Sequence, residues 1–159
     1  MVELKSSARL SSLSLEMSVI LAQTDTTVGF LSQDAKKLYA IKSRPTTKPF
    51  IKVYKDFRSF LQDANRVMKN KKNLVRRSKK TTFIINNFSF RVAQPTINSQ
   101  ILRDTPWFYS TSANKSNEKF NRDFCESKAD IIIENLNGLV EKSSSTLIKI
   151  NKKKMRKLR

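Results

Sequence analysis

Three short polar segments in this sequence of 159 residues carry side chains that could bind a ligand. Residues 23–29 contain several threonine hydroxyls and the carboxylate of Asp25, and the stretch ends in glycine. The carboxylate could pair with an ammonium group. Residues 41–49 contain three cations within seven positions, and residues 110–114 place small hydroxyls before Asn114. Because Lys supplies a point charge and Arg a planar fork, these residue types favour a polar ligand that carries phosphate groups.

Each segment also has a purely structural interpretation. Residues 23–29 fit a turn that is capped by its own side chains. Residues 41–49 fit a helix C-terminus, where cations complement the helix dipole before Pro45 stops the helix. Residues 110–114 fit a helix N-cap or an Asx turn. Spacing alone leaves both interpretations open for all three segments.

Strand and helix patterns surround these segments and must position them. An apolar run predicts a buried strand over residues 17–23, and residues 24–29 follow it as a loop. Helical spacing predicts one helix over residues 33–43 and a second that is capped by Asp56 and continues to Met68. Further strands are expected at residues 50–53, 81–85, 88–92, 107–110, 130–134 and 145–150, with a hairpin turn at residues 86–87, a loop over 111–117 and a modest helix over 95–104.

Alternation of strands with helices, together with one hairpin, predicts an α/β (α+β) fold: a mixed sheet with helices packed on it. The length fits a single domain, which we place at residues 17–150. Residues 1–16 are rich in serine and are expected to be weakly structured, and residues 151–159 are expected to form a basic C-terminal tail.

The charge balance is extreme, with 32 Lys and Arg against 13 Asp and Glu. Two acid-free runs, residues 69–80 and 151–159, hold much of the excess and indicate a polyanionic partner or a solvated basic surface. The candidate RNA-binding side chains of the first run are Lys71, Lys72, Arg76, Arg77, Lys79 and Lys80.

Histidine is absent and Cys125 is the single cysteine, which argues against a tightly bound metal and against catalysis by a Ser–His or Cys–His pair. One cysteine suits a reducing compartment, and no apolar run approaches the roughly 20 residues of a membrane helix. We therefore expect a cytoplasmic protein without a membrane partner.

In order and spacing, the polar segments resemble the motifs of the YrdC-like family. The family's first strand ends in a Pro-Thr-Asp-Thr-Val-Tyr-Gly-like loop, and Lys-x-Arg-Pro, Lys-Pro, Thr-Ser-Ala-Asn and Ser-Thr-Val follow along the chain. The matching residues here are Thr24-Asp25-Thr26 with Gly29, Lys42-Ser43-Arg44-Pro45 with Lys48-Pro49, Thr111-Ser112-Ala113-Asn114, and Ser145-Thr146-Leu147. Arg91 matches an arginine on a middle strand of the family, and residues 130–133 match the strand before its last loop.

The resemblance implies a twisted open mixed sheet and the activity of an L-threonylcarbamoyladenylate synthase. Such enzymes use L-threonine, bicarbonate and ATP with Mg²⁺ to form threonylcarbamoyl-AMP and pyrophosphate, and partner transferases pass the threonylcarbamoyl group to adenosine 37 of tRNA. By similarity, Lys42 and Arg44 would be catalytic ligands of the triphosphate. Ser112, Asn114 and Arg91 would complete the ATP site, and Thr24, Thr26, Ser145 and Thr146 would line the threonine site.

The sequence departs from the family at several positions. Gln23 replaces a proline, and Thr27-Val28 replaces a valine and an aromatic residue. The basic stretch 70–82 stands where the family has Trp-Pro-Gly-Pro-Leu-Thr. These departures admit an alternative, a non-catalytic member that binds double-stranded RNA or tRNA. Composition alone also fits a small basic protein associated with the ribosome.

Overall fold

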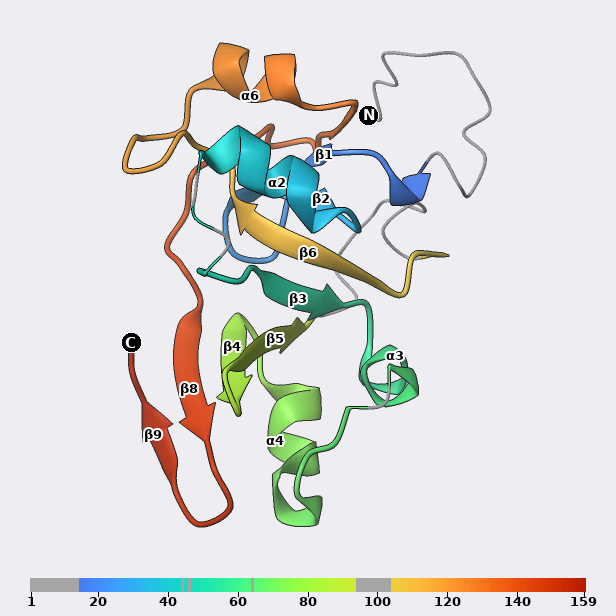
Figure 1. The fold of residues 1–159 in the computed structure, drawn as a ribbon, viewed down its shortest axis with the longest axis vertical. Coiled ribbons are helices and arrows are strands. Elements are labelled where there is room, and N and C mark those ends of the chain that lie inside the picture. Colours follow the sequence, from blue (N-terminus) through green and yellow to red (C-terminus); the bar gives the residue numbers. More distant parts are fainter. Residues whose placement is uncertain (1–14, 44, 46, 64, 94–103) are drawn as a thin grey trace.

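The computed structural model describes residues 15–43, 45, 47–63, 65–93 and 104–159. In these ranges one mixed sheet of nine strands runs in the order β7-β1-β2-β6-β3-β5-β4-β8-β9, which confirms the predicted fold class (Figure 1). The strands are β1 (Ile20–Gln23), β2 (Val28–Ser32), β3 (Ile51–Tyr54), β4 (Thr81–Ile85), β5 (Phe88–Val92), β6 (Trp107–Ser112), β7 (Ile131–Ile133), β8 (Thr146–Ile150) and β9 (Met155–Lys157). The helices are α2 (Ala35–Lys42), α3 (Phe57–Gln62), α4 (Lys72–Arg77) and α6 (Arg122–Lys128), with a 3₁₀ turn η1 (Lys69–Lys71) before α4.

Strand β1 lies inside the sheet and is covered on both faces. Leu21 belongs to a core cluster that includes Leu38 of α2 and Cys125 of α6, whereas Ile20 packs on the opposite face with Phe108. Side chains alternate between the faces of a strand, so a strand that is buried on both faces needs a continuous apolar run. This requirement explains the uninterrupted sequence of residues 19–22.

The other end of the sheet is built on the hairpin of β4 and β5. Asn86 and Asn87 form its two-residue turn with φ angles of 49° and 64°, the left-handed backbone that a tight hairpin requires, so the predicted hairpin is confirmed. Phe83 and Phe90 face each other across the two strands and pack against Val75 of α4. Figure 1 shows α3 and α4 at this end of the molecule and α2 and α6 at the opposite end.

The helix that Asp56 caps is shorter than predicted. Asp56 accepts a hydrogen bond from the backbone N–H of Ser59, as expected, but α3 ends at Gln62 and does not continue to Met68. Asp63 ends the helix because its carboxylate accepts hydrogen bonds of 2.6 Å from both Lys52 and the Tyr54 hydroxyl on the neighbouring strand. Tertiary contacts therefore overrode the helical pattern of the sequence.

Several elements were not predicted. Residues 28 and 29, which the sequence predicts as loop, belong to β2, so only residues 24–27 form the turn between β1 and β2. Residues 111 and 112, also predicted as loop, belong to β6. Gly29 permits this pairing, because a Cβ atom there would lie 3.0 Å from the carbonyl oxygen of Thr111. The sequence also does not predict α4, α6 or β9.

Helix α2 confirms the helix expected over residues 33–43, with Asp34 as its N-cap. The strand expectations at residues 50–53, 130–134 and 145–150 are likewise confirmed by β3, β7 and β8. Nearly all of the helix expected at residues 95–104 falls outside the described residues. Within the described ranges, every helix is too short or too polar to cross a bilayer.

Candidate functional site

One pocket of about 340 Å³ joins the two ends of the sheet. The turn between β1 and β2 supplies Thr24 and Thr26, and the end of β6 supplies Ser112. Arg91 of β5 and Ser145, just before β8, enter from the other end. The pocket therefore gathers five of the residues predicted to bind ATP or threonine, although they are spread over 122 positions of the chain, from 24 to 145.

Lys42, Ser112 and Asn114 form a polar cluster beside this pocket. The buried Nζ atom of Lys42 donates to Oδ1 of Asn114 at 2.6 Å, to the carbonyl oxygen of Asn114 at 2.6 Å and to that of Ser112 at 3.1 Å. The Ser112 hydroxyl donates to the same Oδ1 atom at 2.7 Å. Only Ser112 of the three lines the pocket, so it connects the Lys42 cluster to the cavity.

The end of α2 directs Lys42 toward β6. Ser43 takes a left-handed conformation with φ 45° and ends the helix, and its N–H bonds back to the carbonyl oxygens of Ala40 and Tyr39. The Ser116 hydroxyl donates to the carbonyl oxygen of Lys42 at 2.6 Å. The helix C-terminus proposed as the structural interpretation is therefore present, and the same geometry places the Lys42 ammonium at the cluster. Arg44, the second predicted catalytic cation, lies outside the described residues.

The turn between β1 and β2 is held by its own hydroxyls. The Thr24 hydroxyl donates to the carbonyl oxygen of Thr27 at 2.6 Å and accepts from the backbone N–H of Thr26 at 3.2 Å. This is the side-chain-capped turn that the sequence allowed, and it also forms part of the pocket wall. The structural and the ligand-binding interpretations of residues 23–29 are therefore compatible.

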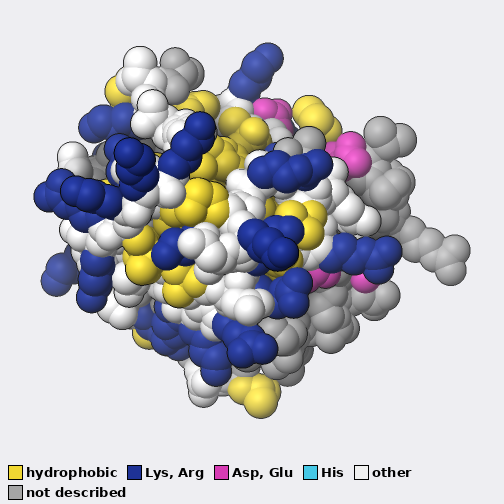
Figure 2. Space-filling model, turned by 90° about the horizontal axis from the view of Figure 1, so that it is seen from below, with side chains coloured by type: hydrophobic (Ala, Val, Ile, Leu, Met, Phe, Trp, Pro, Cys, Tyr) yellow, Lys and Arg dark blue, Asp and Glu magenta, His cyan; other side chains and the backbone are white. Residues whose placement is uncertain are grey.

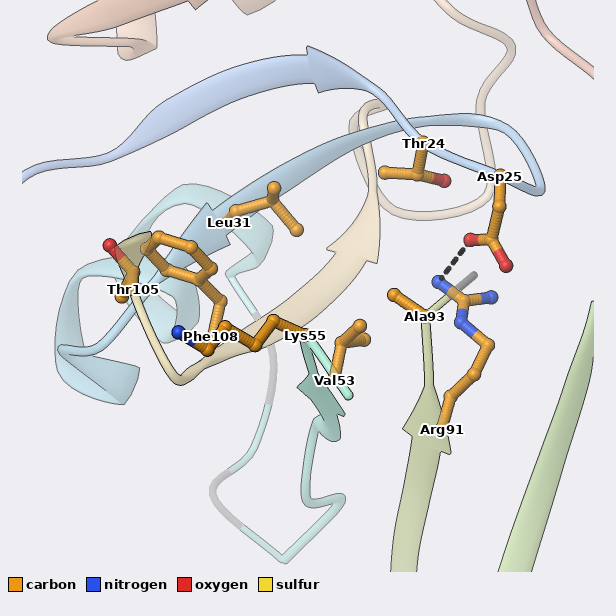
Figure 3. A pocket seen from close by; sticks show the side chains of 9 residues that line it. All are labelled: Thr24, Asp25, Leu31, Val53, Lys55, Arg91, Ala93, Thr105 and Phe108. Carbon is orange, nitrogen blue, oxygen red and sulfur yellow. Dashed lines mark ion pairs between the residues drawn. The ribbon is translucent and has the colours of Figure 1, made fainter. Parts of the chain in front are cut away.

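Arg91 and Asp25 form a buried ion pair beside the pocket. Figure 3, which draws a smaller neighbouring cavity, shows the Arg91 side chain extending from β5 toward the turn that carries Asp25. Nη2 of Arg91 lies 3.3 Å from Oδ1 of Asp25, and Nη1 donates to the Thr26 hydroxyl at 2.9 Å. Burial lowers the pKa of the Arg91 guanidinium, and the Asp25 carboxylate opposes that shift. Arg91 lines both the pocket and a second, smaller cavity of about 30 Å³ between β2, β3 and β6, whereas Asp25 lines only the smaller one.

Ser145 and Thr146 have different environments. Ser145 is buried in the pocket wall, and its hydroxyl lies 2.8 Å from that of Thr82 on β4. Thr146 pairs with Thr81 at the start of β8 and is not among the residues that line the pocket. The structure therefore brings Ser145 to the predicted threonine site and leaves Thr146 in the adjoining strand.

Arg159 is a pocket residue that the sequence did not reveal. Strand β9 folds back antiparallel on β8, and beyond it the Nε atom of Arg159 donates to the carbonyl oxygen of Ser145 at 3.2 Å. Asn151 makes the turn, since its Oδ1 atom accepts from the backbone N–H groups of Lys153 and Lys154. Asparagine between two β-like stretches is a turn signal that could have predicted this hairpin.

Two remaining sequence features lie away from the pocket lining. Cys125 is buried in the core, and burial raises the pKa of its thiol, so it is not placed to act as a nucleophile. The side chains of the first basic run lie on η1, on α4 and in the turn before β4, and most of them are exposed. Within the described ranges, no group of three or more Cys, Asp or Glu residues is arranged to hold a metal ion.

Comparisons with known proteins connect this architecture to one family. The Sua5/YciO/YrdC family model, described as telomere recombination, matches residues 16–159. No curated protein matches the chain. Among solved structures, P. abyssi Sua5 complexed with L-threonine is 16% identical with a TM-score of 0.68, and the match covers 96% of this chain and 55% of that one.

Two further structures show the same fold. Full-length HypF in its phosphate- and nucleotide-bound form gives a TM-score of 0.71 at 16% identity, covering 92% of this chain but 28% of HypF. E. coli YciO gives a TM-score of 0.66 at 16% identity, covering 89% of this chain and 82% of YciO. This chain thus spans about half of Sua5 and a smaller part of HypF. Because the family model covers nearly the whole chain, this protein belongs to the Sua5/YciO/YrdC family.

Proposed function

We propose that this protein is an L-threonylcarbamoyladenylate synthase that acts on L-threonine, bicarbonate and ATP. The observation that carries the proposal is the pocket in which Arg91, Arg159 and several hydroxyls meet, with the Lys42 cluster at its edge. A site of this kind offers cations for phosphate groups and hydroxyls for an amino acid. The similarity to a Sua5 protein solved with L-threonine agrees with that assignment.

In the proposed reaction, threonine and bicarbonate first combine to a carbamate with loss of water. A carbamate oxygen then attacks the α-phosphorus of ATP, and the bond to the bridging oxygen breaks as pyrophosphate leaves with its electron pair. Lys42 and Arg44 stabilise the negative charge of the leaving group, and Ser112 and Asn114 hold the nucleotide. The catalytic contribution is positioning and electrostatics, which requires no histidine.

Thr24, Thr26 and Ser145 would surround the threonine in the pocket, with Thr146 supporting Ser145 from the first residue of β8. Magnesium would arrive with the nucleotide, because Mg²⁺ at such sites is held largely by substrate phosphates. The product would serve a transferase that modifies tRNA, and the proposed pathway partners are therefore transferase proteins and tRNA.

The test is pyrophosphate release by the purified protein. We expect release only when L-threonine and bicarbonate are present together with ATP and Mg²⁺, and no release when either of the first two is omitted. D-Threonine serves as the control substrate, because it has the same composition and the wrong geometry for an oriented site. Release that is independent of threonine, or no release at all, would reject the synthase assignment.

A specific observation favours a second function, binding of RNA. Residues 65–93 contain nine Lys or Arg and residues 142–159 contain eight, and neither range contains Asp or Glu. The sheet places their strands β5, β4, β8 and β9 side by side, so two acid-free ranges that are far apart in sequence form one cationic end of the molecule. Figure 2 shows dark blue Lys and Arg side chains spread over this end, with a few magenta acidic ones in the right half of the view.

The positive charges of residues 65–93 and 142–159 are not neutralised by acidic side chains of the same ranges. Among the described residues Arg91 is the member of this group that forms a salt bridge, and its partner Asp25 belongs to the other end of the sheet. A phosphate backbone would neutralise such a surface and release counterions. Helix α4 turns Val75 into the core and exposes Lys72, Arg76 and Arg77, so its outer face is basic and suits a phosphate backbone.

The RNA function predicts affinity for an RNA hairpin that falls steeply with salt, with several counterions released. Replacing Lys71, Lys72, Arg76 and Arg77 together by alanine should weaken binding and flatten the salt dependence. The double variant Lys42→Ala, Arg44→Ala should keep most of the RNA affinity. Loss of binding in this double variant would instead locate the RNA affinity at the nucleotide pocket. Equal binding to vesicles that contain phosphatidylserine would indicate general polyanion attraction.

A further inference from the structure

Asp25 is a buried carboxylate to which the proposed reaction gives no role. The side chains of Asp25 and Arg91 are only 7% and 5% exposed, and a single contact of 3.3 Å joins them (Figure 3). Oδ2 of Asp25 and Nε of Arg91 have no hydrogen-bond partner among the described residues. A bidentate arginine–carboxylate pair would give both atoms a partner, so the observed geometry is not the strongest ion pair that these two side chains could form. Another contact must therefore fix the position of the guanidinium.

That contact is the hydrogen bond of the other Nη atom of Arg91. Nη1 donates to the Thr26 hydroxyl at 2.9 Å, while Nη2 faces Asp25. Asp25 and Thr26 are neighbours in the turn between β1 and β2, so one short segment holds both terminal nitrogens of the guanidinium. Since the Thr26 oxygen accepts from Arg91, its own hydrogen remains available for donation.

The Thr24 hydroxyl determines where the Thr26 hydrogen points. Thr24 has one hydroxyl hydrogen, and it is donated to the carbonyl oxygen of Thr27 at 2.6 Å. In the 3.2 Å contact between the two hydroxyls, Thr26 must therefore be the donor and Thr24 the acceptor. The hydrogen bonds run in one direction, from Arg91 to Thr26, from Thr26 to Thr24, and from Thr24 to Thr27.

We infer that Asp25 is a positioning residue: it holds Arg91 so that Arg91 fixes Thr26 as a hydrogen-bond donor to an acceptor oxygen of the ligand. Thr24 has no hydrogen left to give to a ligand, whereas Thr26 can turn its hydrogen from Thr24 to a ligand oxygen in the pocket that both residues line. Asp25 also balances the charge of Arg91. Among the described pocket-lining residues, Arg159 is then the cation without a carboxylate partner.

The inference rests on the proposed function for the identity of the ligand, which is L-threonine with its carboxylate as the acceptor. Calorimetry with L-threonine compares the unaltered protein with Asp25→Asn, Thr26→Ala and the double variant. We expect each single change to weaken binding roughly tenfold, which is the scale of one hydrogen bond to a charged group. The double variant should bind no more weakly than Thr26→Ala alone. Additive losses would show that Asp25 does not act through Thr26.

Asp63→Asn is the matched control, because Asp63 also pairs with a cation, Lys52 at 2.6 Å, but Lys52, unlike Arg91, does not line the pocket. This variant should keep the affinity for L-threonine. A loss equal to that of Asp25→Asn would mean that removing any such ion pair loosens the site, and would overturn the inference.

A ligand-free measurement separates failure of this inference from failure of the proposed function. In NMR spectra of arginine-labelled protein, a guanidinium held at both Nη atoms rotates slowly and gives resolved Nη signals. We expect such signals for Arg91, and we expect them to merge in Asp25→Asn but to stay resolved in Asp63→Asn. If they stay resolved in Asp25→Asn, Asp25 is not the residue that holds Arg91, whether or not L-threonine binds.

Discussion

The two ends of the sheet differ in charge and in packing, and the pocket needs both. The end with β7, β1, β2 and β6 contributes hydroxyls of the turn after β1 and of β6, and β1 is packed on both faces. The end with β5, β4, β8 and β9 contributes Arg91 and Arg159, and its residues 65–93 and 142–159 include no Asp or Glu. Most of the pocket's hydroxyls thus come from one end and both of its arginines from the other, so neither end can form the site alone.

The largest effect should come from breaking the core of the cationic end. Phe90 is fully buried between Phe60 and Phe83, and Phe90→Ala should lower the free energy of unfolding by about 3–5 kcal/mol in urea titrations. Phe88 is half-buried on the same strand, so Phe88→Ala should cost clearly less. Equal losses for the two variants would show that this end is not organised around Phe90.

The next effect concerns the polar cluster of Lys42, Ser112 and Asn114, which lies at the end of the sheet with β2 and β6. Lys42→Ala should reduce pyrophosphate release by roughly 100-fold or more, because a buried cation next to the nucleotide would be lost. Lys36→Ala changes an exposed lysine of the same helix and should leave the rate unchanged. A rate within a few-fold of the unaltered protein in Lys42→Ala would remove Lys42 from the catalytic set.

A smaller effect is expected at Arg159, which follows β9 and lines the pocket. Arg159→Ala should raise KM for an anionic substrate by roughly tenfold with a smaller change in kcat, the scale of one charge-assisted hydrogen bond. Lys157→Ala removes an exposed charge from β9 outside the pocket lining and is the control. If both variants raise KM equally, the effect is general attraction by the cationic end and does not reside in Arg159.

The smallest effect is the pH dependence of stability that an ion pair near β7 contributes. Hydrogen bonds of 2.8 and 3.0 Å from Arg122 hold the pKa of Glu134 below its ordinary value. A lowered carboxylate pKa gives stability that is present above the unfolded-state pKa and is lost as pH falls through the folded-state pKa. Below pH 4.5 the unaltered protein loses this ion pair. In that range, the Tm of Glu134→Gln should therefore fall slightly less steeply with decreasing pH than the Tm of the unaltered protein. An unchanged Tm–pH profile would show that the pair is too exposed to matter.

Much of the fold follows from local sequence signals. The apolar run of β1, the Asn86–Asn87 turn and the caps at Asp34 and Asp56 each specify their element through nearest neighbours in the chain. The candidate site was predicted in part for the same reason, since its motifs lie where strands end. The missed elements are those whose signals are weak locally: β2 contains Gly29 and depends on close contact with β6, and β9 is fully exposed.

The mixed fold, the polar segments and the excess of positive charge can be recognised in the sequence, because residue types, spacing and charge are properties of the chain. Which of these groups meet depends on how the strands are arranged in the sheet. The tertiary structure paired Asp25 with Arg91, joined Lys42 to Asn114, brought Arg159 to the pocket and merged two distant basic runs into one end. The physical reason is that strand order and register bring distant residues together, and no local signal encodes which strands become neighbours.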